Sequence, residues 1–249
     1  MRTPISTYRL QVGSIGVAEA SAYAPYLAAL GISDAYVSPV LRAGSDHGYD
    51  VLDPSVADDR VGGDAGFADL ARRLADEGLG VLLDIVPNHM AVSPENPWWW
   101  DVLEHGRASR FATFFDITWE PPEAPELSGR LVLPVLGSSF GQEVRSSITI
   151  GVDDTRPALV ARYHDRTFPI DPATYGAVEA WAEESALRGL WSAASRVPWR
   201  DGAQADERSQ ATAGVRTALH RIVDDPAARS ALVSALGLLN GSGESAVAA

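Results

Sequence analysis

The segment that most constrains the fold is residues 81–90, Val-Leu-Leu-Asp-Ile-Val-Pro-Asn-His-Met. Its apolar run is rich in β-branched and leucyl residues, with glycines just before it and a proline near its end. This pattern predicts a buried strand whose side chains pack on both faces, as in a parallel sheet. The run contains one carboxylate, Asp84, and it ends at the polar residues Asn88 and His89.

The presence of Asp84 in a buried strand requires an explanation, because burying a carboxylate without a partner costs free energy. One reason is a structural hydrogen bond to a neighbouring loop. The other is a ligand site at the carboxyl ends of parallel strands, where open α/β sheets and (β/α)₈ barrels place their chemistry. We favour the ligand site, and both readings stay open at this point.

The first part of the chain alternates strand and helix, which favours a parallel sheet with right-handed crossovers. Pro25 is expected to delay or kink the first helix, and Gly31 and Gly78 are expected to end the two helices. The predicted elements are strands at residues 6–11, 34–40 and 81–86, helices at 19–30 and 67–74, and a long loop at 41–63.

The regular alternation stops after His89. Trp98, Trp99 and Trp100 are consecutive, so they cannot all face one core; we expect one or two to fill a core while the rest cover a surface. An alternative is that one of them offers its flat face to a sugar ring. Further predicted elements are strands at residues 131–135, 147–151 and 159–163, helices at 175–191, 206–223 and 228–239, and a flexible tail at 241–249.

Composition excludes several classes of protein. The chain has 249 residues, of which 46% are hydrophobic and none is cysteine, so disulfides and cysteine-bound metals are impossible. A formal net charge of −13 disfavours binding to nucleic acids or anionic membranes. No apolar run is long enough to span a bilayer, and the start of the chain lacks the apolar part of a secretory signal, so we expect a cytoplasmic protein.

Two motifs carry a resemblance to a known family. Residues 84–89 fit the pattern Asp-x-Val-x-Asn-His, and residues 47–54, His-Gly-Tyr-Asp-Val-Leu-Asp-Pro, follow the second predicted strand. Together, each after its own strand, they resemble the first signature and the second-strand loop of the α-amylase superfamily, glycoside hydrolase family 13.

Other segments resemble more closely the maltooligosyltrehalose synthase family within that superfamily, over roughly the first 175 residues. The resemblance implies an isomerase, an intramolecular transferase of trehalose biosynthesis. Such an enzyme converts the reducing-end α-1,4 link of a malto-oligosaccharide into an α,α-1,1 link. The matching segments are residues 7–11, 25–27, 30–32, 36–40, 88–91, 98–104, 115–117, 133–137 and 168–175.

The resemblance implies an α/β fold, a partial TIM (β/α)₈ barrel. Residues 1–90 would form its first three βα units. Residues 91–175 would form an irregular β-rich insertion after the third strand, and residues 176–249 a helical part with a flexible tail, ending before the fourth barrel strand.

The resemblance also implies roles for six residues. Asp84 would organise hydrogen bonds beneath the site, and His89 would bond a hydroxyl of the reacting glucose. Tyr49 would stack on that glucose, with His47 and Asp50 supporting it, although the latter two could equally shape the loop by hydrogen bonds. Asn88 would hold its loop; in many amylases the equivalent asparagine ligates a structural calcium. We predict no cofactor and no metal.

The bond-breaking carboxylates are missing from the expected places. A retaining mechanism needs two carboxyl groups about 5–5.5 Å apart, and the family carries its nucleophile in a Gly-x-Arg-x-Asp pattern. Residues 214–218 have that spacing but end in alanine and look helical. We therefore expect no activity from this chain by itself. The family resemblance implies an α-1,4-glucan or malto-oligosaccharide as its partner. The competing readings are an α-amylase-type hydrolase and a non-catalytic α-glucan-binding module.

Overall fold

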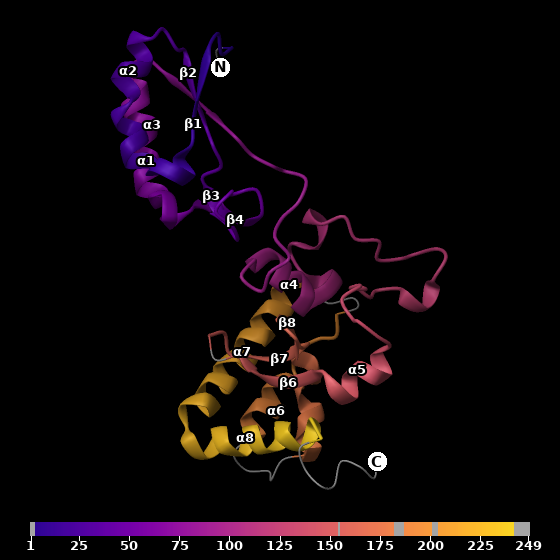
Figure 1. Cartoon of the computed structure of the whole chain (residues 1–249). Coiled ribbons are helices and arrows are strands. Elements are labelled where there is room, and N and C mark those ends of the chain that lie inside the picture. Colours follow the sequence, from indigo (N-terminus) through magenta and orange to yellow (C-terminus); the bar gives the residue numbers. More distant parts are fainter. Residues whose placement is uncertain (1–2, 154, 182–186, 201–203, 242–249) are drawn as a thin grey trace. The chain divides into compact units, whose positions relative to one another are not determined.

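The computed structural model describes residues 3–153, 155–181, 187–200 and 204–241 (Figure 1). These residues form two compact units, Met1–Pro97 and Trp98–Ala249, each with its own core. In the described part of the chain no helix has the length and apolar character needed to cross a membrane. The tail predicted to be flexible lies, apart from Gly241, outside the described residues.

Unit 1 is built on a parallel sheet whose strand order is β1-β2-β5. The strands are β1 (Thr7–Leu10), β2 (Asp34–Val37) and β5 (Gly80–Leu83), and each register row joins one residue of each. Helices α1 (Val12–Ala22), α2 (Ala24–Ala29) and α3 (Gly63–Asp76) lie along one side of the sheet (Figure 1). The predicted alternation and parallel pairing are confirmed.

The core of unit 1 lies between the sheet and these helices. Leu70 and Leu74 of α3 are fully buried, as their helical spacing predicts, against Leu10, Ala35 and Val37 of the strands. Each buried leucine contributes about 1.5–3 kcal/mol by leaving water. This packing buries one face of the sheet.

Glycines end two of the helices as predicted. At the end of α3, Gly78 has φ 73°, the N–H of Leu79 donates to Leu74 O and that of Gly78 to Ala75 O. This is the Schellman arrangement, which requires the left-handed conformation that glycine adopts freely. Gly31 ends α2 in the same way, with φ 83°.

The first predicted helix is wrong in its bounds. It begins at Val12 rather than at residue 19, and it is interrupted at Gly16, where φ is 75° and ψ 158°. Pro25 does not kink a single helix; it occupies the first turn of the separate helix α2, where its missing N–H costs nothing.

The strand prediction for residues 81–86 is correct in pairing but wrong in burial. β5 ends at Leu83, and Leu82, Leu83 and Ile85 are 42%, 38% and 57% exposed. In the described structure β5 pairs only with β2, and helices cover only one face of the sheet. An edge strand covered on one face cannot bury both sets of side chains.

The predicted loop at residues 41–63 instead contains an antiparallel pair, β3 (Leu41–Ala43) and β4 (Val51–Ala57), and a short 3₁₀ turn, η1 (Asp59–Val61). Arg60 holds this region together: it binds both carboxylate oxygens of Asp58 and the carbonyl oxygen of Ala43. The sequence pattern does not predict this pairing, because glycines and aspartates outnumber strand-forming residues in residues 41–63.

Unit 2 contains an antiparallel sheet of order β6-β7-β8, made of β6 (Ile148–Asp153), β7 (Ala158–Tyr163) and β8 (Arg166–Pro169). Its core forms against η5 (Pro172–Trp181), α6 (Arg188–Ala194), α7 (Ala205–Asp224) and α8 (Pro226–Leu239) (Figure 1). The predictions for β6, β7, α7 and α8 are confirmed. The division into parts at residues 90 and 175 stays a prediction.

Two predictions in unit 2 are wrong. Residues 131–135 form no strand: Val132 is 62% exposed, and Pro134 cannot donate to a sheet. Residues 175–191 are not one helix, because η5 is a 3₁₀ run and α6 begins at Arg188; residues 182–186 lie outside the described structure. Before the sheet, α4 (Pro97–His105), η2 (Gly106–Ala108), η3 (Ala112–Phe114), η4 (Pro125–Leu127) and α5 (Phe140–Ser146) are joined by long irregular segments.

Candidate functional site

The candidate site lies in unit 1, where the parallel strands end. Parallel pairing places the carboxyl ends of β1, β2 and β5 at one edge of the sheet. Arg9, Tyr36 and Leu82 share a register row, and their side chains point away from the face that Leu10 and Val37 pack against the helices. Asp84 follows directly after β5 and its N–H donates to Val37 O at 2.9 Å.

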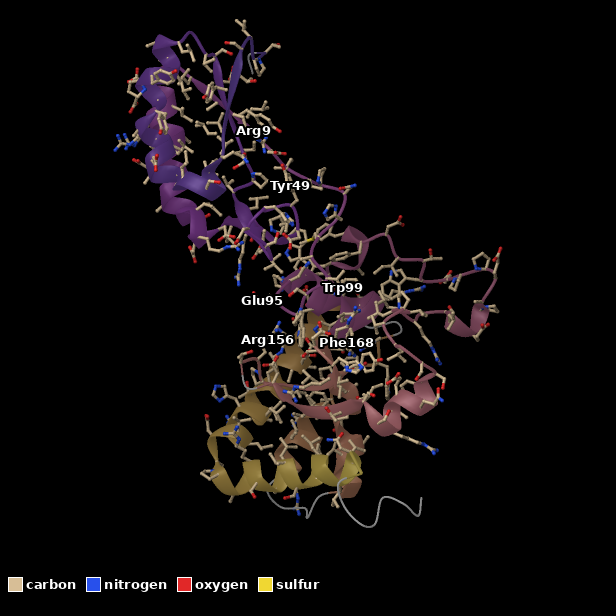
Figure 2. The ribbon with its side chains drawn as sticks, in the orientation of Figure 1. Arg9, Tyr49, Glu95, Trp99, Arg156 and Phe168 are labelled. Atoms are coloured by element: carbon tan, nitrogen blue, oxygen red, sulfur yellow. The ribbon has the colours of Figure 1, made fainter. Side chains whose placement is uncertain are left out.

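Three side chains meet here in a closed triangle. Arg9 Nη2 lies 2.8 Å from Asp84 Oδ2, and the Tyr49 hydroxyl donates to the same oxygen at 2.9 Å. Arg9 Nη2 also donates to the Tyr49 hydroxyl at 3.3 Å. Figure 2 shows Arg9 and Tyr49 side by side. Asp84 thus has the partners that a largely buried carboxylate requires, since its side chain is only 15% exposed.

The triangle keeps Asp84 ionised. Burial by itself would raise the pKa of Asp84, but hydrogen bonds from Arg9, Tyr49 and Tyr36 outweigh it and hold that pKa below its usual value. Asp84 in turn raises the pKa of Arg9, whose guanidinium also lies 4.5 Å from the centre of the Tyr36 ring. The site therefore presents a fixed carboxylate, a permanent cation and a hydroxyl.

Tyr49 is held by its own loop. Its ring stacks on His47 with centroids 5.8 Å apart and an interplanar angle of 26°, and its N–H donates to His47 Nδ1 at 3.2 Å. Asp50 accepts from the N–H and hydroxyl of Ser45 at 3.2 and 2.5 Å. Despite burial, which acts the other way, these bonds lower the pKa of Asp50. These contacts are those of loop-shaping residues, one of the two roles expected of His47 and Asp50.

Asn88 and His89 are exposed, and His89 Nδ1 lies 3.1 Å from Asn88 Oδ1. Their loop returns to the β3–β4 pair, where the N–H of Ala91 donates to Val51 O at 2.8 Å. The structure thus brings Tyr49 and Asp84 into contact and places His47 and Asp50 beside Tyr49. Among the described contacts, Asn88 and His89 touch each other and not the triangle.

Arg9 is the site residue that the sequence interpretation missed. Its signal was available: a cation stands in a short strand, one residue before the core residue Leu10, and therefore on the opposite face of the sheet. The cost of burying Asp84 also called for a cation. The pattern of a single strand cannot identify that cation, because the ion pair joins Arg9 of β1 to Asp84 after β5, and β2 lies between these strands.

The residues around Asn88 do not fit a calcium site. Calcium takes about six to eight oxygen ligands, and the Asn88 side-chain oxygen meets the His89 ring nitrogen instead. In the ranges that the structure describes, no group of three or more histidine and carboxylate side chains converges.

The consecutive tryptophans divide as the structural reading predicts. Trp100 is 5% exposed and packs with Ala158 and Val160 of unit 2, and the Arg156 guanidinium lies 4.0 Å from the centre of its ring. Trp98 and Trp99 are half-buried and pack against phenylalanines. One fills a core and two cover a surface.

Comparison with known proteins gives concordant results. Residues 17–145 match the family model "Alpha amylase, catalytic domain". Over 144 residues the chain is 46% identical to the "Putative maltooligosyl trehalose synthase" of Mycobacterium tuberculosis, a match that covers 54% of this chain and 18% of the relative.

Solved structures agree. The maltooligosyltrehalose synthase of Arthrobacter ramosus is 41% identical, with a TM-score of 0.53, over 68% of this chain and 21% of that one. A second structure, described as maltooligosyl trehalose synthase, is 34% identical with a TM-score of 0.56, over 68% of this chain and 23% of its own. The chain spans about a fifth of the length of these proteins.

Proposed function

Since this chain belongs to the alpha-amylase family, whose catalytic domain is a TIM barrel, we propose that it supplies the first three βα units of a maltooligosyltrehalose synthase barrel. The substrate would be a malto-oligosaccharide, and the reaction the isomerisation of its reducing-end α-1,4 link to an α,α-1,1 link. One observation carries the proposal: the Arg9–Asp84–Tyr49 triangle stands at the carboxyl ends of parallel strands.

We assign the triangle the task of holding the reacting glucose in place. Asp84 is neutralised by Arg9 and accepts two hydrogen bonds through one oxygen, so it is suited to anchoring neighbours rather than to attacking a sugar. It fixes the Tyr49 ring, whose face can cover the apolar side of a glucose. An aromatic face also tolerates the positive charge of an oxocarbenium-like state.

His89 and Asn88 complete the proposed contacts. With Nδ1–H directed at Asn88 Oδ1, the other ring nitrogen, Nε2, can accept a hydrogen bond from a sugar hydroxyl, and such bonds strengthen as charge develops on the ring. Asn88 Oδ1, 3.1 Å from His89 Nδ1, orients the imidazole. His47 and Asp50 keep the Tyr49 loop in shape.

Tyr49, Asp84 and His89 are assigned to holding the sugar and not to breaking its glycosidic bond. Residues 214–218, which had the spacing of the nucleophile pattern, lie inside helix α7 and not on a strand. We propose that the chain by itself turns over no malto-oligosaccharide. Conversion of maltohexaose to a trehalose-ended product by this protein alone, at a rate unaffected by removal of trace contaminants, would refute that.

A chimeric enzyme tests the proposed function. Residues 1–175 replace the corresponding segment of the Mycobacterium tuberculosis relative, and the chimera is incubated with maltohexaose. We expect loss of reducing ends as the non-reducing product accumulates. Release of new reducing ends would indicate a hydrolase instead, and a folded chimera that changes neither would refute both.

A further inference from the structure

A cluster of aromatic rings in unit 2 is not used by the proposed reaction. Trp98 of α4 and Phe111 stack almost in parallel, with centroids 5.3 Å apart and an interplanar angle of 8°. Phe114 of η3 leans against both, 5.2 Å from Trp98 and 5.7 Å from Phe111, at 36° and 42°. We call Trp98, Phe111, Phe114 and the adjacent Arg110 the aromatic platform.

Hydrogen bonds hold the turn that carries the platform. Ser109 joins the turn to α4 by donating its hydroxyl to Asp101, and it accepts the N–H of Phe111 at 3.0 Å. The N–H of Phe114 donates to Phe111 O at 3.0 Å. The rings are therefore preorganised, so a ligand would not have to pay for ordering them.

The rings of the aromatic platform are more exposed to solvent than the rings of a hydrophobic core. Phe114 is 61% exposed and Trp98 and Phe111 are half-buried, whereas the neighbouring Trp100 is 5% exposed and belongs to a core. Arg110 is exposed and its guanidinium lies 5.3 Å from the centre of the Phe111 ring. In the described structure that ring is the partner of Arg110, so its five N–H donors are available to acceptors.

We propose that the aromatic platform binds an α-1,4-glucan. Aromatic faces match the C–H faces of pyranose rings, and a free guanidinium beside them can donate to sugar hydroxyls. A neutral ligand also suits a chain with a net charge of −13, which would repel acidic polymers. The choice of glucan rests on the proposed function, but the platform uses none of the residues of the candidate site.

The test is calorimetric titration of the full chain with maltoheptaose, supported by native electrophoresis in gels containing glycogen. Phe114→Ala and Arg110→Gln remove the exposed ring and the donors. Phe140→Ala is the matched control, because Phe140 of α5 is 65% exposed and lies outside the platform. Tyr49→Ala reports on the candidate site.

We expect Phe114→Ala to weaken glucan binding by about fivefold or more, as loss of one stacking ring predicts, and Arg110→Gln to weaken it by a smaller factor. Phe140→Ala should bind like the original protein, and Tyr49→Ala should keep platform binding. Arg110→Gln leaves every ring in place, so it tests the platform even if Phe114→Ala folds poorly.

Several results would refute the proposal that the aromatic platform binds a glucan. They are absence of glucan binding by the original protein, equal effects of Phe114→Ala and Phe140→Ala, and a Phe114→Ala variant that changes self-association in sedimentation but not sugar affinity. Binding lost in Tyr49→Ala and unchanged in Phe114→Ala would overturn the platform while supporting the proposed function. Platform binding with an inactive chimera would refute the proposed function alone.

Discussion

Replacing Arg216 by methionine tests how unit 2 tolerates buried charge. Glu104 of α4 is 1% exposed, and its Oε2 pairs with Arg216 Nη2 of α7. Its other oxygen, Oε1, has no hydrogen-bond partner in the described structure. Burial raises the pKa of Glu104, although Arg216 acts in the opposite direction. The Arg216→Met variant leaves this carboxylate buried without its cation.

The neighbouring His105 cannot replace Arg216 as the cation that pairs with Glu104. His105 Nε2 lies 3.4 Å from Glu104 Oε2, but burial lowers the pKa of His105 to about 4, so the imidazole is neutral at pH 7. Breaking a buried ion pair costs about 3–5 kcal/mol, and we take the lower end because Arg216 is 41% exposed. A loss of about 3 kcal/mol is a large part of the ~5–15 kcal/mol that stabilises a domain.

The loss should depend on pH. Without Arg216 the native pKa of Glu104 rises further, so native Glu104 holds a proton that the unfolded chain releases above about pH 4.3. The free energy of unfolding of Arg216→Met should therefore fall, relative to the original protein, as pH rises from 5 to 8. The double variant Glu104→Gln/Arg216→Met, which has no charge to bury, should be more stable than Arg216→Met at pH 8.

Urea unfolding followed by tryptophan fluorescence measures this directly, because all seven tryptophans lie in unit 2. Arg221→Met, an exposed arginine on the same helix, is the control and should change stability by less than about 0.5 kcal/mol. A loss in Arg216→Met no larger than in the control, or one that is equal at pH 5 and 8, would refute the reasoning.

Three further predictions concern single contacts. Leu70→Ala should destabilise unit 1 by about 2–5 kcal/mol, measured as faster hydrogen exchange in residues 3–97, because Leu70 is fully buried. Arg60 lowers the pKa of Asp58 to about 2, so Asp58→Asn should cost about 2 kcal/mol above pH 4. That cost should vanish as pH falls through 2, as followed by circular dichroism. Asp225 caps α8 through the N–H groups of Ala227 and Ala228, so Asp225→Ala should cost about 1 kcal/mol in the fluorescence assay.

Local periodicity predicted the elements whose contacts are local. The spacing of Leu70 and Leu74 gave the buried face of α3, and Gly78 gave its end. The apolar run before Asp84 predicted β5. These features depend on residues that are close together in the sequence, so local sequence patterns predict them.

Features that join distant segments were missed or misjudged. Arg9 reaches Asp84 across the sheet, and no pattern within either strand shows that pairing. The exposure of Leu82 and Leu83 follows from β5 standing at the sheet edge, not from its composition. The β3–β4 pair lies in a segment whose glycines predict a loop, and Arg60 there joins Ala43 of β3 to Asp58, which follows β4.

The central claim is that the Asp84 carboxylate, fixed by Arg9, holds Tyr49 in place for the reacting glucose. The most direct measurement is kcat/KM of the chimera for maltohexaose with Asp84→Asn, with Asp69→Asn on the exposed face of α3 as control. We predict a loss of about a hundredfold for Asp84→Asn, as expected when a positioning group is removed, and little change for the control. Equal kcat/KM in the two variants would contradict the claim.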